Sequence, residues 1–164
     1  LTEVYNHGYF QGYLENEISL SARKGTTLSL ILADVDDFKI FNDKYGHQTG
    51  DFILKELCKV IRQSLRSHDI IARYGGEEFA IILVETTGKD AQSVAEKLRQ
   101  SIALHNFIYK DKNYHVTICC GIAEIRPAVD PFTKNDLIDF ADKALFESKK
   151  KGRNCVTLYT RRNK

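Results

Sequence analysis

Three acidic residues follow one another where an apolar segment of the chain ends. Asp34 closes the run that begins at residue 28, and Asp36 and Asp37 come directly after it. Carboxylates that alternate at the end of a strand resemble the oxygen ligands that Mg²⁺ prefers. On its own this pattern is also that of an ordinary acidic loop, with capping and solvation roles.

Two further groups supply carboxylates and cations. Gly75-Gly76-Glu77-Glu78 separates two β-rich runs, and Lys149-Lys150-Lys151-Gly152-Arg153-Asn154 follows a helical pattern. The glycines are typical of a tight turn, and the cations could complement a helix C-terminus or clamp phosphate. Metal-assisted phosphoryl or nucleotidyl transfer uses carboxylates to bind the metal and cations to bind the phosphates. These three segments together supply both kinds of group.

The elements that must position these groups mix helices with strands. Helical spacing of apolar residues is found over residues 9–22, 51–65, 88–103 and 133–151. Strand-like runs cover residues 28–33, 69–74, 77–84, 114–125 and 155–159. The two runs that flank Gly75-Gly76 predict a β-hairpin, and Thr133 with Asp136 predicts a capping box. The pattern predicts one α/β domain.

Composition limits the function classes. The chain has 164 residues, 43% of them hydrophobic and 28% charged, with a net charge of +2. These values are typical of a globular domain and give no reason to expect a nucleic acid or a membrane surface as partner. No apolar run reaches the roughly 18 residues of a membrane span. Four cysteines without C-x-x-C spacing are typical of reduced thiols in a cytoplasmic domain rather than of a metal site.

The motifs, taken in order, resemble the GGDEF family of diguanylate cyclases. Residues 33–51 (ADVDDFKIFNDKYGHQTGD), residues 73–79 (RYGGEEF) and the closing KxxGRN at 149–154 carry the resemblance. It implies an α/β (α+β), ferredoxin-like fold related to the palm of nucleotide cyclases and polymerases, in which helices flank a central, mostly antiparallel sheet. Residues 1–164 would form one GGDEF domain. Because the chain lacks Met and starts inside a family motif, we expect the C-terminal output domain of a longer protein with an N-terminal sensory or dimerisation domain.

The resemblance also assigns a metal site and a proton acceptor. Asp34 and Glu77 would be side-chain ligands of Mg²⁺ (or Mn²⁺), with the backbone carbonyl of Val35 as a third oxygen. Glu77 would also accept the 3′-hydroxyl proton, assisted by Glu78, and the sequence leaves open which of the two serves.

The substrate-binding residues follow from the same resemblance. Lys39, the backbone amides near Phe38, Lys149 and Arg153 would hold the triphosphate of GTP. Asn42, His47 and Asp51 would form the guanine pocket, although His47 is also explained as a surface histidine. A carboxylate at position 51 can accept both N1–H and N2–H₂ of guanine, which favours GTP over ATP.

The implied reaction joins two GTP molecules into cyclic di-GMP and two pyrophosphates. Because each domain would hold one GTP, catalysis would require a homodimer. Arg66 and Asp69 form an R-x-x-D pattern at the family's product-inhibition site. A surface Arg–Asp pair at a helix end is the ordinary alternative.

Two other functions remain as alternatives. One is a catalytically silent module that binds GTP or cyclic di-GMP as a sensor, but such members typically lose the metal carboxylates that this chain keeps at Asp34, Glu77 and Glu78. The other is a relaxed cyclase that makes mixed cyclic dinucleotides, against which Asp51 argues.

Overall fold

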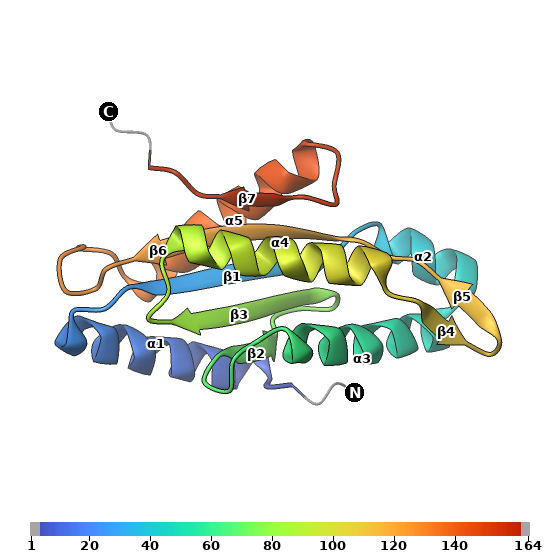
Figure 1. Ribbon diagram of the computed structural model, residues 1–164, viewed down its shortest axis with the longest axis horizontal. Coiled ribbons are helices and arrows are strands. Elements are labelled where there is room, and N and C mark those ends of the chain that lie inside the picture. Colours follow the sequence, from blue (N-terminus) through green and yellow to red (C-terminus); the bar gives the residue numbers. More distant parts are fainter. Residues whose placement is uncertain (1–3, 162–164) are drawn as a thin grey trace.

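A central sheet organises the chain (Figure 1), whose computed structural model describes residues 4–161. The strand order in the described part is β2-β3-β1-β6-β7. The middle strand β1 (Leu28–Val35) pairs antiparallel with β3 (Glu78–Val84) and with β6 (Ile118–Ile125). On the edges, β2 (Ile70–Arg73) is antiparallel to β3 and β7 (Val156–Leu158) is parallel to β6. The expected central, mostly antiparallel sheet is confirmed.

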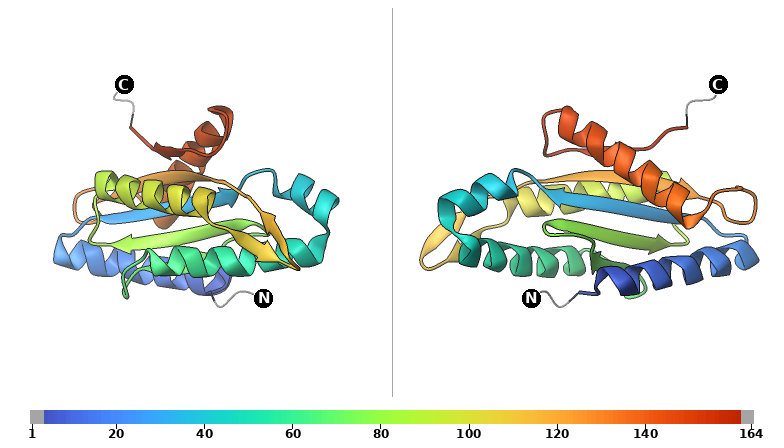
Figure 2. Two further views of the ribbon diagram at one scale, coloured as in Figure 1. Left: turned by 45° about the vertical axis from the view of Figure 1, so that its right-hand side comes forward. Right: turned by 180° about the vertical axis from the view of Figure 1, so that it is seen from behind.

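Helices cover both faces of this sheet (Figure 2). One face packs against α1 (His7–Lys24) and α5 (Lys134–Lys150), and the other against α2 (Phe38–Tyr45), α3 (His47–Gln63) and α4 (Gly88–Leu104). Successive residues of a strand point to opposite faces. Alternating residues of β1 accordingly enter two separate apolar clusters, Leu30 and Leu32 on the α1/α5 face and Ile31 and Ala33 on the other. Cys119 and Cys120 of β6 divide between the faces in the same way, as the sequence predicted.

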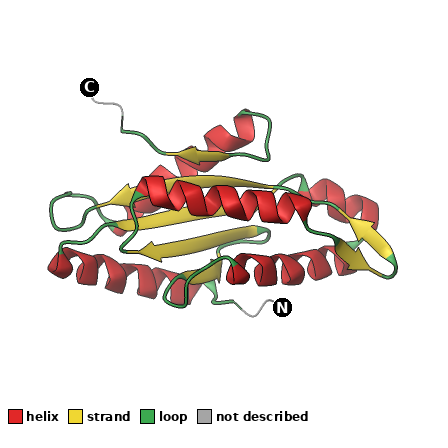
Figure 3. Ribbon diagram, viewed as in Figure 1, coloured by secondary structure: helices red, strands yellow, loops and turns green. Residues whose placement is uncertain are grey.

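Several short elements differ from the sequence prediction. Helix α2 is not predicted, and α3 begins four residues before position 51. The single strand predicted over residues 114–125 is interrupted, because β5 (Lys112–Tyr114) pairs with β4 (Phe107–Tyr109) in a separate hairpin (Figure 3). Three-residue strands and an eight-residue helix are too short to show a full apolar period.

The helix ends follow the predicted signals more closely. Thr133 accepts a hydrogen bond from the Asp136 backbone N–H while Asp136 accepts one from Thr133, so the capping box is present. Gly46, which ends α2, has φ 85. That left-handed conformation favours glycine and lets α3 start immediately after α2.

Helix α5 lies directly against the backbone of β6. A Cβ built at Gly121 would stand 2.1 Å from the Leu145 backbone nitrogen and 2.2 Å from the Ala141 carbonyl oxygen. The buried Ser148 hydroxyl also donates to the Cys120 carbonyl at 2.8 Å. These contacts set the depth of α5 on the sheet, and with it the position of Lys149 at the C-terminal end of the helix.

Of the helices in the described part of the chain, none is long and apolar enough to span a membrane.

We expect Gly121→Ala to destabilise the domain strongly, by about 3 kcal/mol or more, because the new methyl group would overlap backbone atoms that cannot rotate away. Thermal unfolding measures the effect. Gly12→Ala is the matched control, since no atom lies within 4 Å of a Cβ at that helical position, and it should stabilise by about 0.5–1 kcal/mol. Equal unfolding temperatures for the two variants would show that α5 does not depend on the close approach.

Candidate active site

A cleft of about 290 Å³ opens where β1 ends. Strand β1, the β2–β3 hairpin, α2 and the C-terminal end of α5 all contribute to it. Its lining consists of Asp34, Val35, Asp36, Asp37, Phe38, Lys39, Ile40, Glu77, Lys149 and Arg153. The fold therefore brings seven residues of the predicted site into one cleft, from segments more than 100 positions apart in sequence.

The register of the sheet places Asp34 directly opposite Glu78. Burial raises the pKa of the Asp34 carboxyl even though Lys149 Nζ donates to its Oδ2 at 2.8 Å. Burial, followed by the charge of Asp34, likewise raises the pKa of Glu78. Burial by itself would lower the pKa of Lys149, but the hydrogen bond to Asp34 and nearby carboxylates raise it overall. The ammonium group of Lys149 thus stabilises the neighbouring carboxylates of both Asp34 and Glu78.

The hairpin tip brings Glu77 beside the end of β1. The Val35 N–H donates to the Glu77 carbonyl at 3.3 Å. Arg73 braces the tip, since its Nη2 donates to the Gly76 carbonyl at 2.6 Å. Arg73 is the first residue of the RYGGEEF motif, and the sequence pattern indicated no role for its side chain.

The reason for the first hairpin glycine differs from the expected one. Among the described residues, the glycines with positive φ do not include Gly75 or Gly76. A Cβ at Gly75 would lie 2.6 Å from the Glu78 carboxylate oxygen Oε2, so a larger residue there would require that carboxylate to move.

The three acids after β1 have different neighbours. Asp34 faces Lys149, and the exposed Asp37 pairs with Arg153 at 3.1 Å from Oδ1 to Nε. The carboxylate of Asp36 instead accepts hydrogen bonds from Thr117, Cys119 and the Asn154 backbone.

Helices α2 and α3 pack closely together beside the cleft. The Asn42 amide occupies the space where Gly50 has no Cβ, with Oδ1 1.9 Å from the position such a Cβ would take, and Phe38 closes the same spot. Asn42 Oδ1 is buried and has no hydrogen-bond partner among the described residues. Asp51, in the first turns of α3, is partly exposed, and His47, at its first residue, is exposed.

Two of the predicted residues lie in a different cavity. Arg66 and Asp69 line a space of about 350 Å³ beside β3 and α4. The Arg66 backbone N–H donates to Asp69 Oδ2 at 2.9 Å. The Asp69 side chain is only 5% exposed and its Oδ1 has no hydrogen-bond partner in the described chain. Within the same residues, no ion pair joins the Arg66 guanidinium to Asp69.

The donor set can be tested against a divalent cation. In the described part of the chain, no cluster of three or more His, Cys, Asp or Glu side chains is placed to hold a metal ion. The predicted metal site needs only two such side chains, because it combines the carboxylates of Asp34 and Glu77 with the Val35 carbonyl. All three supply oxygens of the kind that Mg²⁺ and Mn²⁺ take. These oxygens line one cleft, so the residues present fit a cation.

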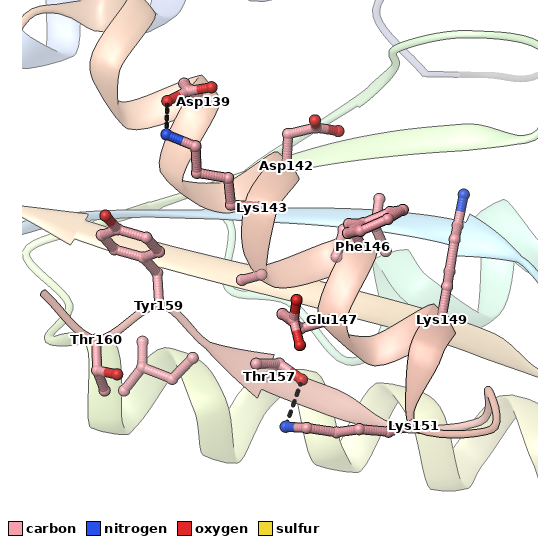
Figure 4. Close-up of a pocket in the computed structure, with 13 residues that line it drawn as sticks. Asp139, Asp142, Lys143, Phe146, Glu147, Lys149, Lys151, Thr157, Tyr159 and Thr160 are labelled. Atoms are coloured by element: carbon pink, nitrogen blue, oxygen red, sulfur yellow. Dashed lines mark hydrogen bonds and ion pairs between the residues drawn. The ribbon is translucent and has the colours of Figure 1, made fainter. Parts of the chain in front are cut away.

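A larger cavity, about 780 Å³, lies along α5 and β7 (Figure 4). Two of its lysines already have partners, since Lys143 pairs with Asp139 at 2.6 Å and Lys151 donates a hydrogen bond to the Thr157 hydroxyl at 3.1 Å. Of the residues in the predicted site it shares only Lys149 with the cleft. The chemistry-bearing residues gather in the smaller cleft.

Comparison with known proteins gives a consistent result. The family described as "Diguanylate cyclase, GGDEF domain" matches residues 1–155. Diguanylate cyclase A of Treponema denticola is 41% identical over 154 residues, covering 93% of this chain and 41% of that protein. The chain spans about half the length or less of the first curated relatives that it matches.

Solved structures agree in fold. The GGDEF domain of DgcB from Caulobacter crescentus, in complex with c-di-GMP, has a TM-score of 0.91 and 31% identity over 98% of this chain and 91% of that one. The active GGEEF domain of a diguanylate cyclase from Vibrio cholerae has a TM-score of 0.90 and 30% identity, covering 98% and 100% of the two chains. The ferredoxin-like, palm-related architecture expected from the motifs is thereby confirmed. With a family match over nearly all of its length and the same fold around its motifs, this chain belongs to the GGDEF family of diguanylate cyclase domains.

Proposed function

We propose that this domain condenses two GTP molecules into cyclic di-GMP and releases two pyrophosphates. The observation that supports this most is the single cleft in which Asp34 and Glu77 lie with Lys39, Lys149 and Arg153. Carboxylates beside cations suit a metal-bound triphosphate, because electrostatic stabilisation of the transferring group is usually the largest catalytic contribution.

Asp34, Glu77 and the Val35 carbonyl would hold Mg²⁺ or Mn²⁺ in this cleft. When bound, such an ion supplies charge neutralisation for the triphosphate and polarises its phosphoryl oxygens. Lys39 and the backbone amides at the start of α2 would bind the phosphates, where the helix dipole favours negative charge. Lys149 and Arg153 would bind the phosphates from the opposite side of the cleft. Lys149 would leave Asp34, and Arg153 would leave Asp37, to contact phosphate oxygens instead.

The guanine base would bind between α2 and α3. Asn42 Oδ1, which lacks a partner among the described residues, can accept a hydrogen bond from an exocyclic amine or ring N–H. Asp51 would accept both N1–H and N2–H₂ of guanine, which adenine cannot offer. His47 would lie at the edge of this pocket.

The chemistry needs a proton acceptor and a second domain. The 3′-oxygen of one GTP attacks the α-phosphorus of the other, its proton passes to Glu77 or Glu78, and the bond to pyrophosphate breaks. The raised pKa of Glu78 suits it to accept a proton. In a second step, the 3′-oxygen of the other nucleotide attacks the remaining α-phosphorus. This closes the ring and releases the second pyrophosphate. Because each domain would hold one GTP, a homodimer brings the reactants together, which is worth about 7–11 kcal/mol of the barrier.

Feedback by the product would act at the separate cavity of Arg66 and Asp69. The exposed guanidinium of Arg66 can form paired hydrogen bonds to phosphate or to a guanine edge. Asp69 Oδ1, which lies 3.9 Å from His68 Nε2 and has no hydrogen-bond partner among the described residues, can accept hydrogen bonds from guanine. A location in the cytoplasm, where GTP is available, accords with the cysteines, all four of which are free thiols.

Incubation of the chain with GTP, ATP and Mg²⁺, both alone and fused to a coiled-coil dimer, tests the reaction. Mass spectrometry should detect cyclic di-GMP from GTP, more of it from the dimer, and no adenine-containing product. Asp34→Ala should lower the rate about 100-fold or more, as loss of a key electrostatic group does. A dimer that binds GTP without forming a dinucleotide would favour the sensor, and mixed dinucleotides would favour the relaxed cyclase.

Arg66→Ala should weaken inhibition by cyclic di-GMP without lowering the initial rate. Charge-assisted hydrogen bonds contribute about 1.5–3 kcal/mol, so the inhibition constant should rise roughly tenfold to a hundredfold. Arg23→Ala, an exposed change on α1, is the control. An unchanged inhibition constant for Arg66→Ala means that the product does not act there.

Glu78→Gln should raise the unfolding temperature at neutral pH. Because the folded state raises the pKa of Glu78 above its ordinary 4.5, the folded domain holds this proton more tightly than the unfolded chain. That stabilisation is present below the ordinary pKa and is lost as the pH rises through the folded value. The gain from Gln should therefore be clear at about pH 8 and small at about pH 4. Glu147→Gln, at an exposed position, is the control, and a gain independent of pH would contradict the explanation.

A further inference from the structure

The segment between α5 and β7 has an unusual backbone. Gly152, Arg153 and Asn154 have φ angles of 105, 67 and 45 in succession. Asparagine tolerates this left-handed region, but arginine is uncommon there because its Cβ crowds the backbone. A strained conformation persists only where surrounding contacts hold it. Arg153 nevertheless stands in this segment at the edge of the cleft.

One contact that holds the segment is the carboxylate of Asp36, beside the hydrogen bond that Arg99 Nη1 donates to Asn154 Oδ1 at 2.8 Å. Its Oδ2 accepts a hydrogen bond from the Asn154 backbone N–H at 2.9 Å and another from Thr117 Oγ1 at 2.6 Å. Its Oδ1 accepts one from Cys119 Sγ at 3.0 Å. The Asp36 N–H in turn donates to the Thr117 carbonyl at 2.9 Å. One carboxylate therefore ties the end of β1 to the start of β6 and to the loop before β7.

Asp36 differs in this respect from its neighbours. Asp34 and Asp37 contact the same C-terminal region only through the side chains of Lys149 and Arg153. The Asp37–Arg153 pair is about half exposed on both sides, and such pairs are weak and easily exchanged. Among these three acids, only Asp36 contacts the main chain of the segment.

Both oxygens of Asp36 are already engaged. Three donors occupy three of the roughly four lone-pair positions of a carboxylate, and all three belong to the protein. About one lone-pair position is left for a ligand, and any further contact would have to displace a protein donor. The contacts of Asp36 thus point to a role toward the protein backbone rather than toward the substrate.

We propose that Asp36 is a positioning residue for phosphate binding. It keeps residues 152–154 in their left-handed conformation, so that Arg153 faces the cleft beside Lys149, whose position α5 sets, while the two side chains exchange carboxylates for phosphates. This proposal rests on the proposed function, in which those two cations hold a triphosphate. It predicts that loss of the Asp36 contacts loosens the segment and weakens phosphate binding more than it affects the reaction step.

The test compares Asp36→Asn with the wild-type chain. The introduced side-chain amide would present a donor to one of the groups that now donate to the carboxylate. Hydrogen exchange at residues 152–156 should become faster, while exchange in α4 stays unchanged. KM for GTP and the dissociation constant for inorganic tripolyphosphate with Mg²⁺, measured by calorimetry, should both rise about tenfold or more, because the loss of one charge-assisted hydrogen bond to phosphate changes the affinity by about that factor. The fall in kcat should be smaller.

Controls separate the possible failures. Asp139→Asn removes an exposed acid of α5 that pairs with Lys143 and should match wild type. If Asp36→Asn does not fold, Thr117→Val removes one donor from the same carboxylate and should shift exchange and KM in the same direction, whereas Thr117→Ser, which keeps the hydroxyl, should not.

Unchanged exchange at residues 152–156, or faster exchange with unchanged tripolyphosphate affinity, would overturn the proposal. A wild-type chain that binds tripolyphosphate but makes no dinucleotide would instead refute the proposed reaction alone. In that case the exchange and affinity measurements still decide the role of Asp36.

Discussion

The register between β1 and β3 is the constraint on which the site depends. The register runs without interruption from the Leu28–Val84 pair at one end of the two strands to the Asp34–Glu78 pair at the other. A slip of one residue would move each side chain of β1 to the other face of the sheet. Since both faces of β1 are buried against helices, such a slip would disturb two apolar clusters at once. Hydrophobic packing along the whole strand thus secures the position of one carboxylate at its end.

That position has an electrostatic cost, which other parts of the fold offset. Burial and the neighbouring charge raise the pKa values of Asp34 and Glu78. Lys149 reaches Asp34 because α5 packs against the bare backbone of Gly121, so the charge balance of the cleft follows from a close helix–sheet contact. The same arrangement leaves a region of negative charge that a cation would stabilise.

Long elements could be predicted from the sequence, and short ones could not. The apolar spacing in α1, α4 and α5 spans several turns and marks these helices clearly, and the paired runs around Gly75 mark the hairpin. Helix α2 begins at Asp37 with φ 52 and without a side-chain cap, so the usual start signal is missing. The β4–β5 hairpin has three residues in each strand. It is stabilised through packing of Phe107 in the core, which no local pattern reveals.

The sequence by itself determined the kinds of groups available: carboxylates at 34–37 and 77–78, cations at 149–153 and a turn between two strands. From these the family, the fold and the residues of the cleft could be predicted. Only the tertiary structure decided what each acid does. Asp34, Asp36 and Asp37 are the same residue type at almost the same place in the chain, and they differ because Lys149, Asn154 and Arg153 approach them from more than 100 positions away. The contacts of a side chain depend on residues that folding brings close from distant parts of the chain. The residue types next to it in the sequence do not indicate which residues those are.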